Sequence, residues 1–164
     1  MRLGEFARWR SHAATMRNGL QLAADARPWT GRKGVTFGGA RLTERQRDLL
    51  DCAFGARRSS MPHDATTEAM RQGFWCNISQ SVQRKPWSTK PPTACRNTQA
   101  YSFESDTILT SFGQMQALGW PRNLASGEEF SQAELSEIAG EGFSVSISCM
   151  IVHFYWCNPY APWW

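Results

Sequence analysis

The sequence predicts an α+β fold that is mostly helical with a few short strands. Apolar residues recur at three- and four-residue steps in several stretches, which is the pattern of a helix with one buried face. Runs of aromatic and β-branched residues between glycines and prolines, at residues 75–82 and 100–103, indicate strands. The length of 164 residues favours one domain, since domains usually contain about 100–200 residues.

The N-terminal part is expected to contain two helices separated by a loop. The apolar spacing over residues 3–23 predicts a helix that is interrupted or ends around Asn18-Gly19. Residues 27–39 contain four glycines and no apolar period, so they are predicted to form a mobile basic linker. The second helix is expected over residues 44–54. A capping box at Thr43-Glu44-Arg45-Gln46 opens it, and Gly55 is expected to close it in the left-handed conformation.

The remaining elements are shorter. Residues 56–72 are expected to form a linker with one short helix, and strands are expected at residues 75–82, 92–95 and 100–103. Three more helices are predicted from their caps and apolar spacing. The first begins after Thr110 and ends at Gly119-Trp120-Pro121. The second begins at the capping box Ser131-Gln132-Ala133-Glu134 and ends at Gly140. The third begins at residue 143 and ends at Asn158-Pro159.

Composition argues against a membrane-spanning or exported chain. The longest weakly polar run, residues 143–157, is shorter than the roughly 20 residues that a spanning helix needs. The N-terminus carries Arg2, Glu5, Arg8 and Arg10 without an apolar core, so no signal peptide is indicated. We therefore expect a cytoplasmic or nuclear protein without a membrane partner.

The charge is uneven along the chain. Residues 1–58 have a net charge of +7 and residues 59–164 a net charge of −3. Basic residues interleaved with tryptophans could follow a nucleic-acid backbone, because cations displace counterions and aromatic rings stack on bases. A solubilising face or a disordered tail would have the same composition. The residues of this set are Arg8, Arg10, Arg17, Arg27, Arg32, Lys33, Trp9 and Trp29.

The five cysteines give no sign of a disulfide framework or a metal site. Their number is odd, their spacing is irregular, and no CxxC pair occurs. Cys149, His153 and Cys157 share one helical face, but the outer two would lie about 12 Å apart, too far to bind one zinc ion. We therefore predict no metal ligands.

Three landmarks from about Asn77 to the C-terminus resemble motifs eight, nine and ten of the cytosine-5 DNA methyltransferases. The first runs from Asn77 to Arg84 and is similar to the family's Gln-x-Arg-x-Arg, with Val82 in place of the first arginine. The second is Leu109-Thr110 followed by Gly119-Trp120-Pro121, which resembles the family's Leu-Thr and Gly-aromatic-Pro. Thr107, Gly113 and Gln116 occupy the three charged positions of this motif. The third is Gly140-Glu141-Gly142-Phe143-Ser144-Val145, which resembles Gly-Arg-Ser-Trp-Ser-Val of the animal de novo enzymes.

The resemblance implies roles for the matching residues. Gln80 and Arg84 would contact nucleic acid, with Arg84 holding an extruded cytosine. The segment of the third motif would border S-adenosylmethionine, although Glu141 replaces an arginine there and would repel the carboxylate of that cofactor. The cofactor-binding residues implied are Gly140, Gly142, Phe143, Ser144 and Val145.

The family's Pro-Cys nucleophile, Glu-Asn-Val and Phe-x-Gly-x-Gly loop are absent before Gln80. Cys52 and Cys76 are expected to be structural. Catalysis by this chain alone is therefore not expected, and S-adenosylmethionine would bind only if a partner chain or upstream sequence supplied the missing motifs. The fold would then resemble the C-terminal part of a methyltransferase domain without its main parallel sheet.

The segments expected are a basic helix and loop (1–40), a capped helix and linker (41–72) and a methyltransferase-like region (73–164). The alternative function is a non-catalytic nucleic-acid-binding or interaction module that uses the basic N-terminal third.

Overall fold

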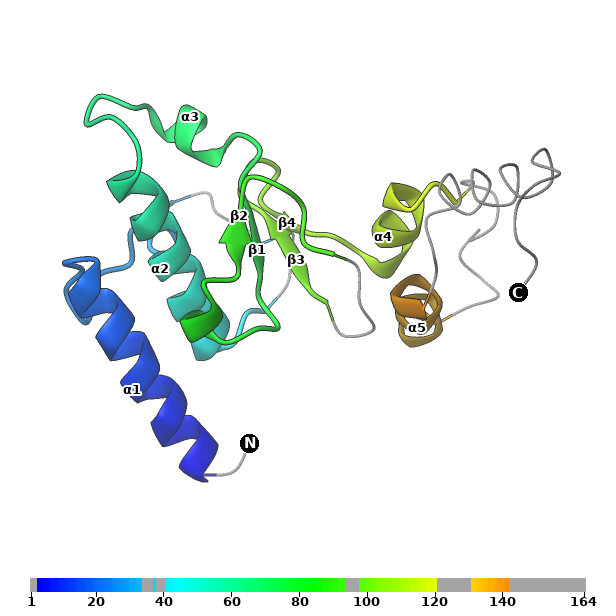
Figure 1. Ribbon diagram of the computed structural model, residues 1–164, viewed down its shortest axis with the longest axis horizontal. Helices are drawn as coiled ribbons and strands as arrows, with labels where there is room; N and C mark the ends of the chain where they lie inside the picture. The colour runs from blue at the N-terminus through cyan, green and yellow to red at the C-terminus, as the bar shows by residue number, and fades with distance from the viewer. Residues whose placement is uncertain (1–2, 34–36, 38–40, 94–97, 121–130, 142–164) are drawn as a thin grey trace, which may run out of the picture. The chain divides into compact units, whose positions relative to one another are not determined.

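The computed structural model describes residues 3–33, 37, 41–93, 98–120 and 131–141, and the chain divides into two compact units (Figure 1). Unit 1 comprises residues 1–93 and 98–108, and unit 2 comprises residues 94–97 and 109–164. These two units replace the single domain expected from the chain length. Helices and an antiparallel sheet are both present, which confirms the α+β class.

The helices of unit 1 agree well with the sequence pattern. The first ends at Gly19, as its glycine indicated, and the second begins at the predicted capping box. The Thr43 hydroxyl oxygen accepts a hydrogen bond from the Gln46 N–H at 3.3 Å, and the Gln46 side chain accepts one from the Thr43 N–H at 2.9 Å. The short helix expected in the 56–72 linker is also present. The three helices are α1 (Leu3–Gly19), α2 (Glu44–Ser59) and α3 (Thr67–Arg71).

Helix α2 continues through Gly55 to Ser59, so the expected glycine cap at this position is wrong. Gly55 is buried, and a Cβ atom placed on it would lie 2.6 Å from Cδ1 of Leu22. The glycine therefore allows the chain that follows α1 to approach α2 closely.

A four-stranded antiparallel sheet packs beside α2, with the strand order β2-β1-β3-β4 (Figure 1). Cys76 in the central strand lies opposite both Trp87 and Tyr101. The strand expected at 100–103 is confirmed. Residues 92–93 form no strand, and the other half of the strand expected at 92–95 lies outside the described residues. The strands are β1 (Trp75–Asn77), β2 (Trp87–Ser88), β3 (Ala100–Ser102) and β4 (Thr107–Ile108).

Strand β1 is shorter than the strand predicted over residues 75–82. The Asn77 carboxamide oxygen accepts hydrogen bonds from the N–H and the hydroxyl of Ser79, at 3.2 and 2.6 Å, and this turn ends the strand. A 3₁₀ turn, η2 (Val82–Arg84), follows it. Arg84 thus lies in this turn, well after the end of β1 at Asn77, and not directly after a strand that reaches residue 82.

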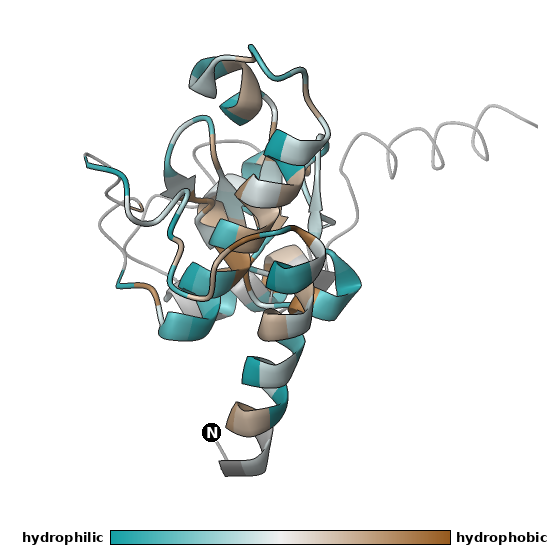
Figure 2. Cartoon of the chain, turned by 90° about the vertical axis from the view of Figure 1, so that its left-hand side faces the viewer, coloured by the Kyte–Doolittle hydropathy of each residue, from teal (hydrophilic) through white to brown (hydrophobic). Residues whose placement is uncertain are grey.

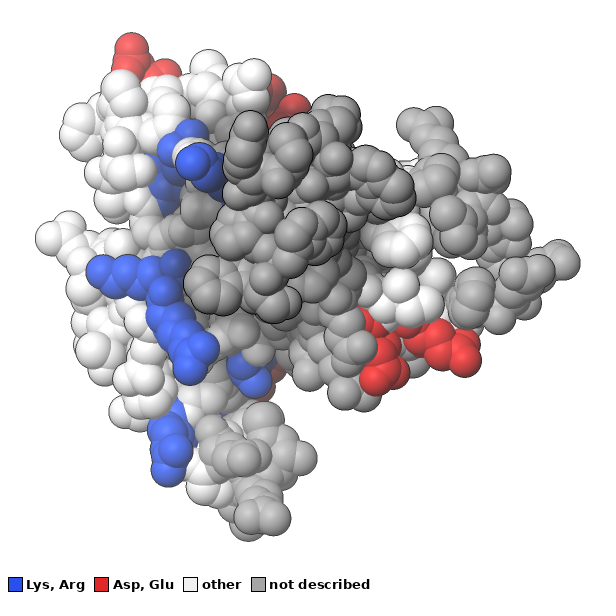
Figure 3. Space-filling view, turned by 45° about the vertical axis from the view of Figure 1, so that its right-hand side comes forward, with Lys and Arg blue, Asp and Glu red and all other residues white. Residues whose placement is uncertain are grey.

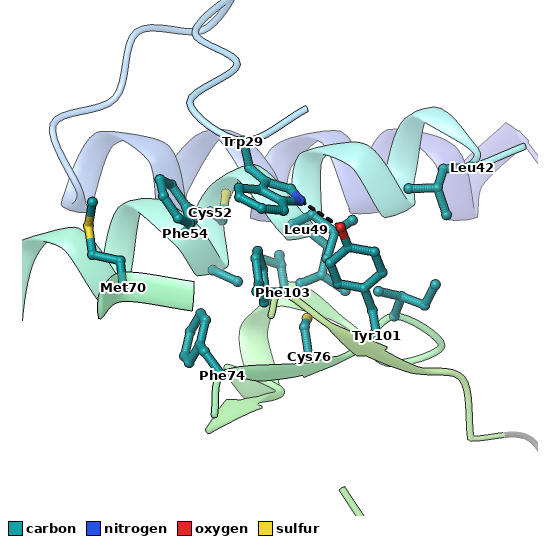
Figure 4. Close-up of a cluster of buried hydrophobic side chains, with 14 residues drawn as sticks. Trp29, Leu42, Leu49, Cys52, Phe54, Met70, Phe74, Cys76, Tyr101 and Phe103 are labelled. Carbon is teal, nitrogen blue, oxygen red and sulfur yellow. Dashed lines mark hydrogen bonds between the residues drawn. The ribbon is translucent and has the colours of Figure 1, made fainter. Parts of the chain in front are cut away.

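The core of unit 1 is built around Trp29, which is only 1% exposed (Figure 4). The Trp29 ring centroid lies 5.0 Å from those of Phe54 in α2 and Phe103 after β3. The indole N–H donates to the Tyr101 hydroxyl at 2.9 Å. The segment expected to be a mobile linker therefore supplies the central side chain of the core.

Asp51 explains why the Trp29 segment is fixed. Its buried carboxylate accepts hydrogen bonds from the N–H groups of Trp29 and Thr30 and from the Thr30 hydroxyl, at 2.7 to 2.9 Å. The guanidinium groups of Arg17 and Arg27 lie 4.0 and 3.6 Å from the same carboxylate. Burial raises the pKa of Asp51 above its ordinary value, although the hydrogen bonds and Arg27 oppose this shift.

Unit 2 contains two described helices, α4 (Ser111–Ala117) and α5 (Gln132–Glu141), and both begin at predicted caps. The Thr110 hydroxyl accepts from the Gly113 N–H, and Ser131 and Glu134 form the second capping box. Met115 of α4 packs with buried side chains of α5. The helix predicted over residues 143–157 lies outside the described residues.

Candidate nucleic-acid interface

The residues implied by the methyltransferase resemblance fall in both units. Gln80 and Arg84 belong to unit 1, and Gly140 lies near the end of α5 in unit 2. Gly142, Phe143, Ser144 and Val145 are outside the described residues. Two of the expected site residues that the structure describes, Gln80 and Arg84, are in contact: Arg84 Nη1 donates a 3.3 Å hydrogen bond to Gln80 Oε1.

The segment that carries Gln80 is held against the first turn of α2. Arg45 Nη2 donates to the carbonyl oxygens of Ser79 and Gln80, at 3.1 and 3.0 Å. The Ser81 hydroxyl accepts from the Gln83 N–H and caps η2. These contacts fix the backbone before Arg84, while the Arg84 side chain is exposed to solvent.

An apolar groove lies beside this segment. It has a volume of about 510 Å³ and is bounded by α1, the first turn of α2 and the residues after β1. Two aromatic side chains, both half-buried, face it from α1, and their ring centroids are 5.2 Å apart. Figure 2 shows the first turns of α1 extending beyond the rest of unit 1. The lining residues are Phe6, Trp9, Thr43, Glu44, Arg45, Gln46, Ile78 and Ser79.

One arginine lines this groove, and another lies against an aromatic ring that lines it. The Arg10 guanidinium lies 4.5 Å from the Phe6 ring centroid and 3.6 Å from the Glu44 carboxylate, and this ion pair is well exposed. Arg45 lines the groove, and Arg84 follows the segment that Arg45 holds. Cations beside aromatic rings match the two parts of a nucleic-acid strand, since phosphates attract the cations and bases stack on the rings.

Unit 1 as a whole is basic, whereas unit 2 is acidic. Unit 1 has sixteen Lys and Arg against nine Asp and Glu, a net charge of +7, and unit 2 has a net charge of −3. All the Lys and Arg side chains coloured in Figure 3 belong to unit 1. No helix of the described part is long and apolar enough to cross a membrane.

Three residues of the basic and tryptophan set that could follow a nucleic-acid backbone make contacts inside unit 1 instead. Arg17 is 4% exposed and donates to Asp48 at 2.9 Å, Arg27 also pairs with Asp48, and Trp29 is in the core. Sequence analysis missed Phe6 and Arg45 as groove residues. Phe6 lies within the helix predicted over residues 3–23 and Arg45 within the predicted capping box, and nothing in the local sequence shows that both elements meet the chain after β1.

Cys52 and Cys76 are both fully buried. Burial raises the pKa of Cys52 to about 11, and it also raises the pKa of Cys76. Neither thiol is therefore a reactive thiolate near neutral pH, in agreement with the structural role expected for both. Within the described residues, no group of three or more His, Cys, Asp or Glu side chains could hold a metal ion.

The chain matches no protein-family model, and the comparisons with curated proteins and with solved structures give no match either.

Proposed function

We propose that unit 1 is a non-catalytic module that binds single-stranded nucleic acid in the groove between α1 and the first turn of α2. The observation that carries this proposal is the pair of half-buried rings, Phe6 and Trp9, in a groove bordered by arginines. A base would stack on the rings, and the phosphates on either side would pair with Arg10 and Arg84. A single strand fits better than a duplex because the bases of a duplex are stacked on one another.

The first experiment measures binding of a fluorescently labelled single strand by the full chain at increasing salt concentration. If the arginines contact phosphates, the logarithm of affinity falls linearly with the logarithm of salt, with a slope of about −0.7 for each phosphate neutralised. A duplex of the same sequence should bind more weakly at every salt concentration. A slope indistinguishable from zero would remove the proposal.

The second experiment separates stacking from charge. Trp9→Ala should weaken single-strand binding roughly tenfold, since stacking of one base on an aromatic ring contributes about 1–3 kcal/mol. Trp9→Phe is the matched control and should keep most of the affinity, because it retains a ring. Equal affinities for the alanine variant and the wild type would place the nucleic acid elsewhere.

A second candidate function follows from the sequence resemblance: the chain would be the C-terminal part of a cytosine-5 DNA methyltransferase-like protein, active only with a chain that supplies the missing motifs. The exposure of Arg84 beside Gln80 favours it, since this guanidinium can reach a base.

The two candidates differ in base preference. If Arg84 holds cytosine, Arg84→Ala should reduce binding to cytosine-containing strands much more than to thymine-only strands. An equal reduction for both strands supports phosphate contact and contradicts the methyltransferase-like role.

A further inference from the structure

A second cavity of unit 1 lies at the other end of α2, and its lining includes three basic side chains. It has a volume of about 300 Å³, at the lower end of the range of about 300–1,000 Å³ typical of small-molecule sites. Arg32 comes from the loop after Trp29, Arg58 from the last turn of α2, and His63 from the connection to α3. None of the described residues that line the cavity is acidic.

This cavity is separate from the groove proposed to bind nucleic acid. Gln46 of the groove and Arg58 of the cavity lie twelve residues apart on α2, a rise of about 18 Å along the helix. A ligand in the cavity would therefore be recognised independently of a base stacked on Trp9.

The other arginines of this region are used to hold the fold together. Arg17 and Arg27 pair with the Asp48 carboxylate. Arg71 donates to the carbonyl oxygens of Phe103 and Glu104 at 2.8 and 2.7 Å. Each of these cations thus has a partner within the fold, so their presence implies no ligand.

Arg32 and Arg58 differ from these structural arginines. Among the described residues, neither forms an ion pair with a carboxylate. Arg32 is held in place, since it donates to the Thr67 hydroxyl at 3.1 Å and its guanidinium lies 5.6 Å from the Trp29 ring centroid. A guanidinium fixed in this way can still donate from its remaining N–H groups, and a second arginine lines the same cavity.

We propose that this cavity binds the phosphate group of a small phosphate monoester. Two guanidinium groups and an imidazole provide the donors that a phosphate dianion needs, and its charge would relieve the repulsion between neighbouring cations. Pro28 and Pro62 offer apolar walls to the remainder of the ligand. The same chemistry would accept the 5′-terminal phosphate of a nucleic-acid strand, and the test separates these two sources.

The position of Arg58 has a competing explanation. Cations in the last turn of a helix are favoured by the partial negative charge of its free carbonyl groups. If that were the whole role of Arg58, its replacement would change helix stability slightly and leave phosphate binding unaffected. Stability and binding must therefore be measured on the same variants.

The test is a titration of the full chain with inorganic phosphate, followed by the backbone amide signals of ¹⁵N-labelled protein at constant ionic strength. We expect saturable shifts confined to Arg32, Arg58, His63 and their neighbours, and no such shifts with chloride. Arg58→Gln should weaken binding roughly tenfold, the loss expected for one charge-assisted hydrogen bond. His63→Gln should also weaken it.

The matched control is Arg47→Gln, which removes an exposed arginine of the same helix outside the cavity. Its phosphate affinity should stay within about twofold of the wild type, as should that of Trp9→Ala. Shifts that do not saturate, or equal losses in Arg58→Gln and Arg47→Gln, would overturn the proposal.

The source of the phosphate is settled by two further ligands. A nucleoside 5′-monophosphate that binds more tightly than inorganic phosphate, with the same dependence on Arg58, identifies a small monoester. A single strand whose affinity rises on 5′-phosphorylation, and loses only that gain in Arg58→Gln, identifies a strand terminus. If the wild type binds phosphate but no single strand at all, the groove proposal is removed and the phosphate proposal stays intact.

Discussion

At the scale of single residues, Asp51 links the two halves of the core of unit 1. It lies on α2, but its hydrogen bonds go to the backbone that positions Trp29, and Trp29 in turn contacts the sheet through Tyr101. Removing the carboxylate would leave buried N–H donors without acceptors, and each such donor costs about 1–3 kcal/mol. The stability of the Trp29 segment therefore depends on one side chain.

We expect Asp51→Ala to destabilise the fold by about 3 kcal/mol or more, because it leaves the buried Trp29 N–H and the partly buried Thr30 N–H unpaired and separates Arg17 and Arg27 from one of their two carboxylates. Asp51→Asn keeps an acceptor oxygen of the same shape and should cost less than half as much. Urea denaturation followed by tryptophan fluorescence measures both changes. Equal losses in the two variants would show that the charge, not the acceptor, holds the loop.

The raised pKa of Asp51 also predicts a pH dependence. Between the ordinary pKa of an aspartate, about 4, and the raised value in the folded state, the folded chain binds more protons than the unfolded chain. The contribution of Asp51 to stability is therefore full below about pH 4 and falls as the pH rises through this window. The difference in unfolding free energy between the wild type and Asp51→Asn should decrease in the same direction. A difference that grows with pH would mean that Arg17 and Arg27 outweigh the burial.

At the scale of elements, a feature formed by residues close in sequence could be predicted from the sequence. A feature formed by residues distant in sequence could not. The capping boxes at Thr43 and Ser131 are visible because donor and acceptor are three residues apart. The roles of Trp29 and Gly55 depend on Asp51 and Leu22, which are distant in sequence. The groove was missed for the same reason, since three separate segments form it.

Gly55 gives the element-scale prediction. Alanine at this helical position gains about 1 kcal/mol of helix propensity, but its Cβ must displace Leu22 at 2.6 Å, and overpacking costs about 1–3 kcal/mol. We expect Gly55→Ala to destabilise the wild type by about 1 kcal/mol and to stabilise the Leu22→Ala background. Thermal and urea unfolding of the four proteins of this cycle give the coupling energy.

Gly4→Ala in α1 is the matched control, since a Cβ there meets nothing within 4 Å, and it should not destabilise the fold. If Gly55→Ala has the same effect with and without the Leu22 side chain, the close approach of these two residues is not what favours glycine.

At the scale of the whole molecule, each unit has its own core. The larger hydrophobic cluster of the described residues draws its buried members from positions 29 to 103, all in unit 1, and the smaller cluster lies within residues 115–139 of unit 2. The proposed groove and the proposed phosphate cavity are also lined by residues of unit 1 alone. Folding and both proposed binding activities should therefore be retained when unit 1 is isolated.

We accordingly predict that a fragment of residues 1–108 folds cooperatively, with a denaturation midpoint close to that of the first transition of the full chain. The fragment keeps the whole Trp29 core and has a net charge of +8, compared with +4 for the full chain. Removing the acidic remainder should leave the salt slope of single-strand binding unchanged if the contacts lie in the groove. The affinity at low salt should rise modestly, because long-range repulsion between unit 2 and the phosphates is lost. Near-ultraviolet circular dichroism and the salt titration test both points. A fragment without fixed tertiary signals would mean that the core of unit 1 needs residues beyond 108, and a reduced slope would place phosphate contacts there.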